Sequence, residues 1–149
     1  MGEFWPVTDV LAYLTGSWRV ERSVRDLASG AEGRFTGTTV FSPLDDGGDG
    51  LLHQESGTFL WQGTPRPAER TLWFLPGGRP GSAAVRFSDG RPFHDLDLTT
   101  GRHIADHPCA ADLYRGEFTV RDENHWRTVW RVRGPAKDLV LTTDYARVD

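Results

Sequence analysis

An alternation of apolar and polar residues begins after Gly16 and recurs along the chain, and this period of two constrains the fold more than any other feature. Residues 18–25 read Trp-Arg-Val-Glu-Arg-Ser-Val-Arg, and residues 34–41 read Arg-Phe-Thr-Gly-Thr-Thr-Val-Phe. Such segments form strands with one buried face and one solvated face. Further extended segments are expected at 51–61, 72–75, 83–87, 92–98, 103–109, 113–120, 125–132 and 138–148. Roughly nine or ten short strands at this spacing predict an all-β protein.

Turn-forming residues separate these segments. The stretch 43–50, Pro-Leu-Asp-Asp-Gly-Gly-Asp-Gly, is an acidic turn, and Pro65 and Pro67 mark the loop that follows the next segment. Pro108 weakens the end of the segment 103–109, because proline cannot donate a hydrogen bond to a neighbouring strand. We therefore expect frequent turns between short strands.

One helix is expected, at the N-terminus. Thr8 or Asp9 can cap a short segment in which Val10, Leu11 and Leu14 form an apolar stripe, and Gly16 would end it. No shift in composition divides the chain, so we expect a single domain over residues 1–149. A meander of strands has two exposed edges, and closure removes both. The sequence thus favours an antiparallel up-and-down β-barrel with a short N-terminal helix; a two-sheet sandwich is the alternative.

Two short motifs carry a resemblance to a known family. Gly16-Ser17-Trp18, directly after the helix, resembles the Gly-x-Trp opening of lipocalin-like (calycin) barrels, and Arg147 resembles the arginine that packs on that tryptophan. The chain also resembles DUF6314, an uncharacterised family of lipocalin-like domains. The segments that carry this second resemblance are 93–96, 107–109, 112–114, 134–138 and 143–147. The resemblance implies a barrel and a contact between Trp18 and Arg147, and it implies no activity.

Charge and composition exclude several functions. The formal net charge is −4 and the isoelectric point about 5.7, which argues against nucleic-acid binding, because phosphates require clustered positive charge. No apolar run reaches the roughly 20 residues of a membrane-spanning helix. The first residues lack the pattern of a signal peptide, and Cys109 is the only cysteine. We therefore expect a cytoplasmic protein, without a membrane partner.

Four polar residues are candidates for catalysis. His53 and Glu55 lie two apart on one strand, so their side chains share a face, where an imidazole and a carboxylate can transfer protons. His94 shares a row with Leu96 and Leu98, and Tyr114 offers a hydroxyl on a large apolar ring. His103, His107 and Cys109 share parity, but Pro108 interrupts them and no further spacing supports a site. We therefore expect neither a metal nor a haem or other cofactor.

Large aromatic side chains suit a cavity for a mostly apolar ligand. The candidate ligand-binding residues are Trp61, Trp73, Phe87, Trp126, Trp130 and Arg131. The first hypothesis is a barrel that binds a small, apolar or aromatic molecule. The alternative is a cofactor-free isomerase, cyclase or dehydratase that uses the His–carboxylate pair, and a barrel filled by its own side chains is a third. The sequence leaves open whether the cavity is catalytic, which ligand it takes and the oligomeric state.

Overall fold

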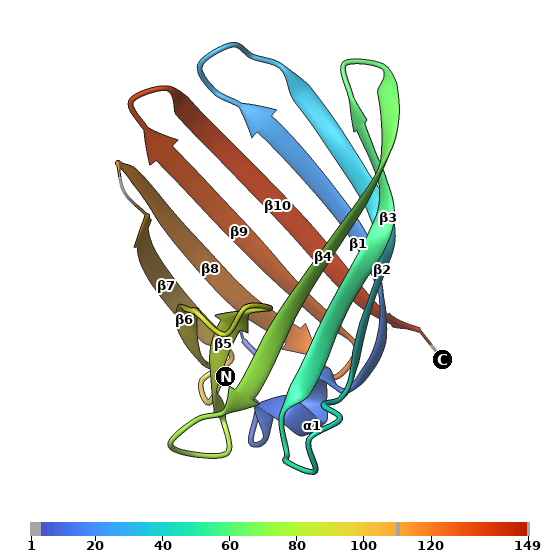
Figure 1. Ribbon diagram of the computed structural model, residues 1–149, viewed down its shortest axis with the longest axis vertical. Helices are drawn as coiled ribbons and strands as arrows, with labels where there is room; N and C mark the ends of the chain where they lie inside the picture. The colour runs from blue at the N-terminus through green and yellow to red at the C-terminus, as the bar shows by residue number, and fades with distance from the viewer. Residues whose placement is uncertain (1–3, 110, 149) are drawn as a thin grey trace.

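The computed structural model of the protein, in which residues 4–109 and 111–148 are described, contains one short helix and ten strands (Figure 1). The elements are α1 (Val10–Leu14), β1 (Gly16–Asp26), β2 (Glu32–Pro43), β3 (Leu51–Trp61), β4 (Thr64–Pro76), β5 (Ser82–Phe87), β6 (Pro92–Asp97), β7 (Arg102–Cys109), β8 (Asp112–Asp122), β9 (His125–Gly134) and β10 (Lys137–Val148). The predicted fold class is confirmed, and the strand positions follow the predicted segments within a few residues, except that β4 begins eight residues before the predicted segment 72–75.

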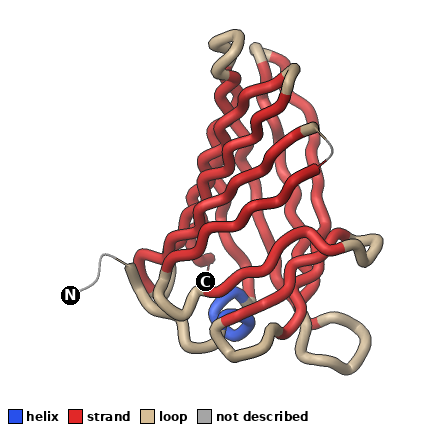
Figure 2. The backbone as a smooth tube through the Cα atoms, turned by 90° about the vertical axis from the view of Figure 1, so that its left-hand side faces the viewer, coloured by secondary structure: helices blue, strands red, loops and turns tan. Residues whose placement is uncertain are grey.

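All ten strands form one antiparallel sheet, in the order β6-β5-β4-β3-β2-β1-β10-β9-β8-β7. The first and last strands of the chain are therefore neighbours, as closure of a barrel requires. The sheet curls round until β6 and β7 are in contact, although no ladder joins them within the described ranges (Figure 2). The barrel is thus nearly closed. The two edge strands, β6 and β7, contact each other, but in the described part of the chain they are not joined by strand hydrogen bonds as full closure would require.

The prediction of a loop around Pro65 and Pro67 is wrong, because both residues lie in β4, which begins at Thr64. Gln62 and Gly63 form the tight turn that precedes it, with φ values of 49° and 81°. The partner strand β5 pairs only with residues 72–76 of β4, so the stretch 64–71 pairs with β3 alone. Prolines are tolerated on such a free edge, since no neighbour requires their missing N–H.

The helix α1 lies across one end of the barrel, as predicted (Figure 1). The carboxylate of Asp9 caps it by accepting a hydrogen bond from the backbone N–H of Ala12 at 3.1 Å. Val10 and Leu14 are buried against the barrel core. The indole N–H of Trp18 donates to the carbonyl of Leu14 at 2.8 Å, which ties the helix to the first strand.

The predicted contact between Trp18 and Arg147 is confirmed. The guanidinium carbon of Arg147 lies 4.2 Å from the centroid of the Trp18 ring, in cation–π geometry. The same guanidinium donates to the carbonyls of Tyr13, Thr15 and Glu123 at 2.8, 3.2 and 3.1 Å. Arg147 therefore joins the helix, β1 and the β8–β9 turn at one end of the barrel.

Replacing Arg147 with alanine is expected to lower the free energy of unfolding by about 2–3 kcal/mol, from the lost cation–π contact and unpaired carbonyls. Urea denaturation measures the change. Arg19 is the matched control, because it is an exposed arginine on the outer face of β1, and Arg19→Ala should cost less than about 0.5 kcal/mol. Equal losses in the two variants would contradict the structural role given to Arg147.

Two facing glycines allow a side chain to lie flat on the inner wall. Gly37 and Gly57 pair in the β2–β3 register. A Cβ atom on Gly37 would lie 2.2 Å from the carbonyl oxygen of Ser56 and 2.9 Å from Cζ of Phe35. The absence of side chains at this pair leaves room for the Phe35 ring, which faces the barrel interior.

Candidate functional site

A buried ion pair crosses the interior of the barrel wall. Arg22 on β1 and Glu55 on β3 reach over β2, and the guanidinium donates to both carboxylate oxygens, at 2.7 Å and 3.0 Å. Thr39 on β2 donates to Oε2 of Glu55 at 2.9 Å, and Thr143 accepts from Nε of Arg22 at 2.7 Å. The hydroxyl of Tyr145 accepts a longer bond from Arg22, at 3.4 Å. The pair is thus satisfied on both sides by neighbouring strands.

The environment of Glu55 keeps it ionised. Burial alone raises the pKa of a carboxylate, but the hydrogen bonds and positive charge of Arg22 outweigh it and lower the pKa of Glu55 to about 2. For Arg22, burial lowers the pKa, whereas Tyr145 and Glu55 raise it, and the net shift is upward. Both groups remain charged at neutral pH, and together they form a neutral unit in the barrel interior.

His53 lies deep in the core as a neutral imidazole. Its ring meets the edge of Phe41 at 5.0 Å between centroids and stacks on Phe74 at 5.6 Å. Burial, assisted by the positive charge of Arg70, lowers the pKa of His53 to about 3. Its Nδ1 atom is buried without a hydrogen-bond partner, which costs about 1–3 kcal/mol.

The proposed acid–base pair does share the inner face of β3, and both side chains are buried. A general base works best when its pKa is near the working pH. Glu55 is a very weak base because Arg22 holds it ionised, and His53 stays neutral among aromatic rings. The geometry therefore gives little support to proton transfer by this pair.

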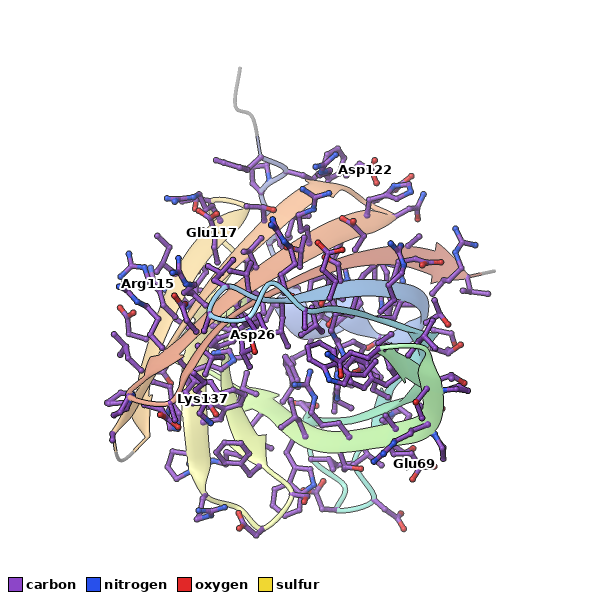
Figure 3. All side chains as sticks on the ribbon, turned by 90° about the horizontal axis from the view of Figure 1, so that it is seen from above. Asp26, Glu69, Arg115, Glu117, Asp122 and Lys137 are labelled. Atoms are coloured by element: carbon purple, nitrogen blue, oxygen red, sulfur yellow. The ribbon has the colours of Figure 1, made fainter. Side chains whose placement is uncertain are left out.

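A pocket of about 260 Å³ lies beside the ion pair, on the side of the barrel away from α1. Five of its nine lining residues are apolar, and the other four are two arginines and two glutamates. The lining residues are Arg22, Val24, Phe35, Glu55, Phe59, Ala68, Glu69, Arg70 and Leu141. Figure 3 looks down on the barrel and shows side chains projecting from the wall toward its interior. This arrangement is typical of a site for a small, mostly apolar molecule.

Arg70 is the second arginine that lines this pocket. It lies directly opposite Glu55 in the β3–β4 register. Within the described part of the chain it makes no ion pair and no side-chain hydrogen bond. It is exposed, whereas Arg22 is mostly buried. The pocket therefore contains one neutralised guanidinium and one that is free.

A second cluster of aromatic and histidine side chains lies between β5 and β9. It brings together the predicted residues Phe87, His94, Tyr114 and Trp130 with Phe93 and His107. Nδ1 of His94 donates to the carbonyl of Asp95 at 2.7 Å, so the neutral ring keeps Nε2 as an acceptor. Burial lowers the pKa of His94 to about 4, although that hydrogen bond opposes the shift. None of these residues lines the pocket beside Arg22.

The remaining predicted ligand-binding residues are dispersed. Trp61 stacks on Phe59 at 6.0 Å, next to the pocket, and Trp126 stacks on Tyr145 at 3.7 Å within the core. Trp73 lies on the face of β4 opposite the buried residues of that strand, so it faces outward. Arg131 also faces outward, where it pairs with Asp138 at 2.7 Å.

Within the described ranges, no group of three or more His, Cys, Asp or Glu side chains can hold a metal ion. His107 contacts Phe93 and Tyr114, and the side chain of Cys109 lies outside the described part of the protein.

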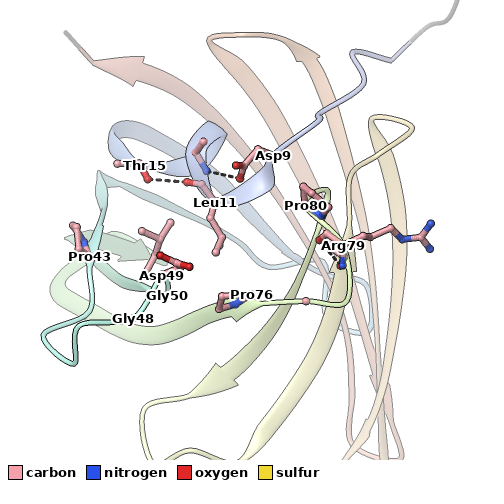
Figure 4. Close-up of a pocket in the computed structure, with 14 residues that line it drawn as sticks. Asp9, Leu11, Thr15, Pro43, Gly48, Asp49, Gly50, Pro76, Arg79 and Pro80 are labelled. Carbon is pink, nitrogen blue, oxygen red and sulfur yellow. Dashed lines mark hydrogen bonds between the residues drawn. The ribbon is translucent and has the colours of Figure 1, made fainter.

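Another hollow, of about 720 Å³, lies outside the barrel at the end covered by α1 (Figure 4). It lies between the helix and the loops that join β2 to β3 and β4 to β5. Its carboxylate at Asp9 already caps the helix, and Arg79 pairs with Asp97 at 3.1 Å. Because the walls of this hollow are mostly loops and two of its charged groups, Asp9 and Arg79, are engaged, we take the barrel pocket as the candidate site.

Sequence reasoning missed Arg22, Thr39 and Arg70. Arg22 lies in the same alternating row as Trp18 and Val20, and this placement of a charge in a buried row is the signal that points to it. Arg70 lies just after Pro65 and Pro67, where a loop was predicted. The sequence therefore could not assign its side chain to the inner or the outer face of a strand.

Fold and pocket together define the class of this protein, a nearly closed, antiparallel up-and-down β-barrel with a pocket in its interior. The chain belongs to DUF6314, a family of unknown function, which matches residues 14–147. No curated protein matches it. In the described part of the chain, none of the helical structure is long and apolar enough to span a bilayer.

Three solved structures share the fold at low sequence identity. The S-type phycobiliprotein lyase CPES from Guillardia theta is 9% identical with a TM-score of 0.69, over 97% of this chain and 94% of the lyase. A DUF3598 protein of unknown function from Nostoc punctiforme is 12% identical with a TM-score of 0.64, over 98% of this chain and 51% of that chain. EF1p2_mFAP2b, bound to DFHBI, is 14% identical with a TM-score of 0.51, over 95% of this chain and 98% of that chain.

Proposed function

We propose that this protein binds a small, largely apolar molecule in the pocket beside the Arg22–Glu55 pair. The observation that carries the proposal is the pocket itself, about 260 Å³ with walls of Val24, Phe35 and Phe59 and a few charged groups. Apolar walls gain free energy by excluding water, and a few polar groups orient a ligand. EF1p2_mFAP2b, which shares the fold, was solved with the small molecule DFHBI bound, and this supports the proposal.

The side chains in the barrel interior are better suited to ligand binding than to proton transfer. The Arg22–Glu55 pair is fully engaged, with Glu55 held ionised, so it acts as a fixed polar floor. A rigid floor and aromatic walls are preorganised, which lowers the entropic cost of holding a ligand. The pocket also favours a binding barrel over one filled entirely by its own side chains.

The neutral fluorescent probe N-phenyl-1-naphthylamine tests this proposal, because its emission rises in apolar surroundings. We expect saturable, single-site binding to the folded protein. Ala68→Trp places a large ring on the pocket wall and should weaken binding by about 10-fold or more, since the probe and the new side chain compete for the same volume. The fluorescence titration of both proteins measures the effect.

Ala146→Trp is the matched control, because Ala146 lies on β10 next to the inward-facing Tyr145 and so faces outward. This variant should bind the probe as the unmodified protein does. Circular dichroism would establish that both variants retain their strands. Non-saturable binding, or binding untouched by Ala68→Trp, would refute the pocket as the ligand site.

A further inference from the structure

We infer that the ligand of this pocket is an organic acid, whose anionic group pairs with Arg70 while its apolar body lies in the pocket. This inference rests on the proposed function and adds the chemical class of the ligand. It is carried by the charges around the pocket: among those on the inner face, in the described part of the chain, Arg70 is the one without an ion pair or side-chain hydrogen bond.

The other two charges on the inner face of the pocket, Arg22 and Glu55, pair with each other. Both oxygens of Glu55 accept hydrogen bonds, from Arg22 and from Thr39. Arg22 is neutralised by that carboxylate and also donates to Thr143. Glu69 borders the pocket, but it alternates with Arg70 along β4 and lies on the outer side of the strand (Figure 3). An incoming anion therefore meets one uncompensated positive charge.

The position of Arg70 suits an amphipathic ligand. Arg70 belongs to the stretch of β4 that pairs only with β3, so the strand's other edge is free. The exposed guanidinium allows a carboxylate to remain partly hydrated while it forms charge-assisted hydrogen bonds, which avoids the large cost of burying an ion. Ala68, two residues away on the same face, leaves space for the apolar body at the pocket wall.

Arg66 provides a matched control on the same strand. It lies on the same face as Arg70, opposite Phe59 in the register, and it is likewise exposed. It does not line the pocket. Removal of either arginine changes the net charge equally, so only a local contact can distinguish the two variants.

The experiment compares two competitors of nearly identical shape, naphthalene-2-carboxylate and its neutral amide, 2-naphthamide. Each is titrated against bound N-phenyl-1-naphthylamine. We expect the carboxylate to displace the probe at a concentration about 5- to 10-fold lower than the amide, because only the acid pairs with Arg70. Arg70→Ala should abolish this preference, measured as the ratio of the two displacement concentrations within that variant, whereas Arg66→Ala should retain the preference. Arg70→Lys should retain part of it, since lysine keeps the charge and loses the planar fork.

Equal displacement by the acid and the amide would overturn the inference and leave the proposed function standing, because both compounds would still bind. A preference that survives Arg70→Ala, or that Arg66→Ala removes equally, would also overturn it. Failure of the neutral probe to bind at all would instead refute the proposed function. The two failures are therefore distinguishable in one set of titrations.

Discussion

Glu55→Gln is expected to lower the free energy of unfolding by about 3–5 kcal/mol, the largest effect of any single substitution proposed for this protein. Glutamine keeps the shape of the side chain and removes its charge. The guanidinium of Arg22, whose side chain is only 13% exposed, would then be buried without a counter-charge. Urea denaturation at neutral pH measures the loss.

Two further variants separate the buried charge from the loss of a contact. The double variant Arg22→Leu with Glu55→Leu should recover most of the stability, because an apolar pair of similar bulk leaves no charge unpaired. Glu117→Gln is the exposed counterpart, since Glu117 accepts from Arg102 on the outer face of the barrel, and it should cost about 1 kcal/mol or less. Glu117 is labelled in Figure 3. If Glu55→Gln lowers the free energy of unfolding by no more than Glu117→Gln does, the role assigned to the buried pair is contradicted.

Acidification from about pH 6.5 to about pH 4.5 is expected to remove about 4–5 kcal/mol of stability through two histidines. Burial lowers the pKa of His53 to about 3 and that of His94 to about 4, whereas both rings titrate near 6.5 when unfolded. In this range the unfolded chain binds protons that the folded protein does not. The stability that the two neutral histidines contribute is complete above about pH 6.5. It is lost as the pH falls toward the pKa values of the histidines in the folded protein.

His53→Leu tests this sign and its source. At about pH 8 the variant should be within about 1 kcal/mol of the unmodified protein, because leucine fills similar space and removes the unpaired Nδ1 atom. At about pH 4.5 it should be relatively more stable by about 2 kcal/mol, since it has no proton to exclude. Denaturation curves over this pH range provide the comparison, and parallel pH profiles for the two proteins would show that His53 is not the source.

The local pattern of the sequence was sufficient to predict the strands, the helix and that His53 and Glu55 share a face, whereas the structure showed that this face is the inner one. Alternation is a property of neighbouring residues, so it assigns a face without knowledge of the partner strand. The Trp18–Arg147 contact was also predictable, because the resemblance to lipocalin-like barrels implied it. Arg22 was visible in the same way, as a charge in a buried row, although its partner was not.

The sequence by itself therefore determined the barrel and which side chains share a face of each strand, and the tertiary structure decided which faces turn inward and which side chains meet. Arg22 and Glu55 are 33 residues apart and pair because β1, β2 and β3 are adjacent in a particular register. Among the described residues Arg70 has no ion-pair partner, because pairing between β4 and β5 begins only at Leu72 and leaves the preceding stretch of β4 on a free edge. Register and closure depend on contacts distant in the chain, and no local pattern contains them.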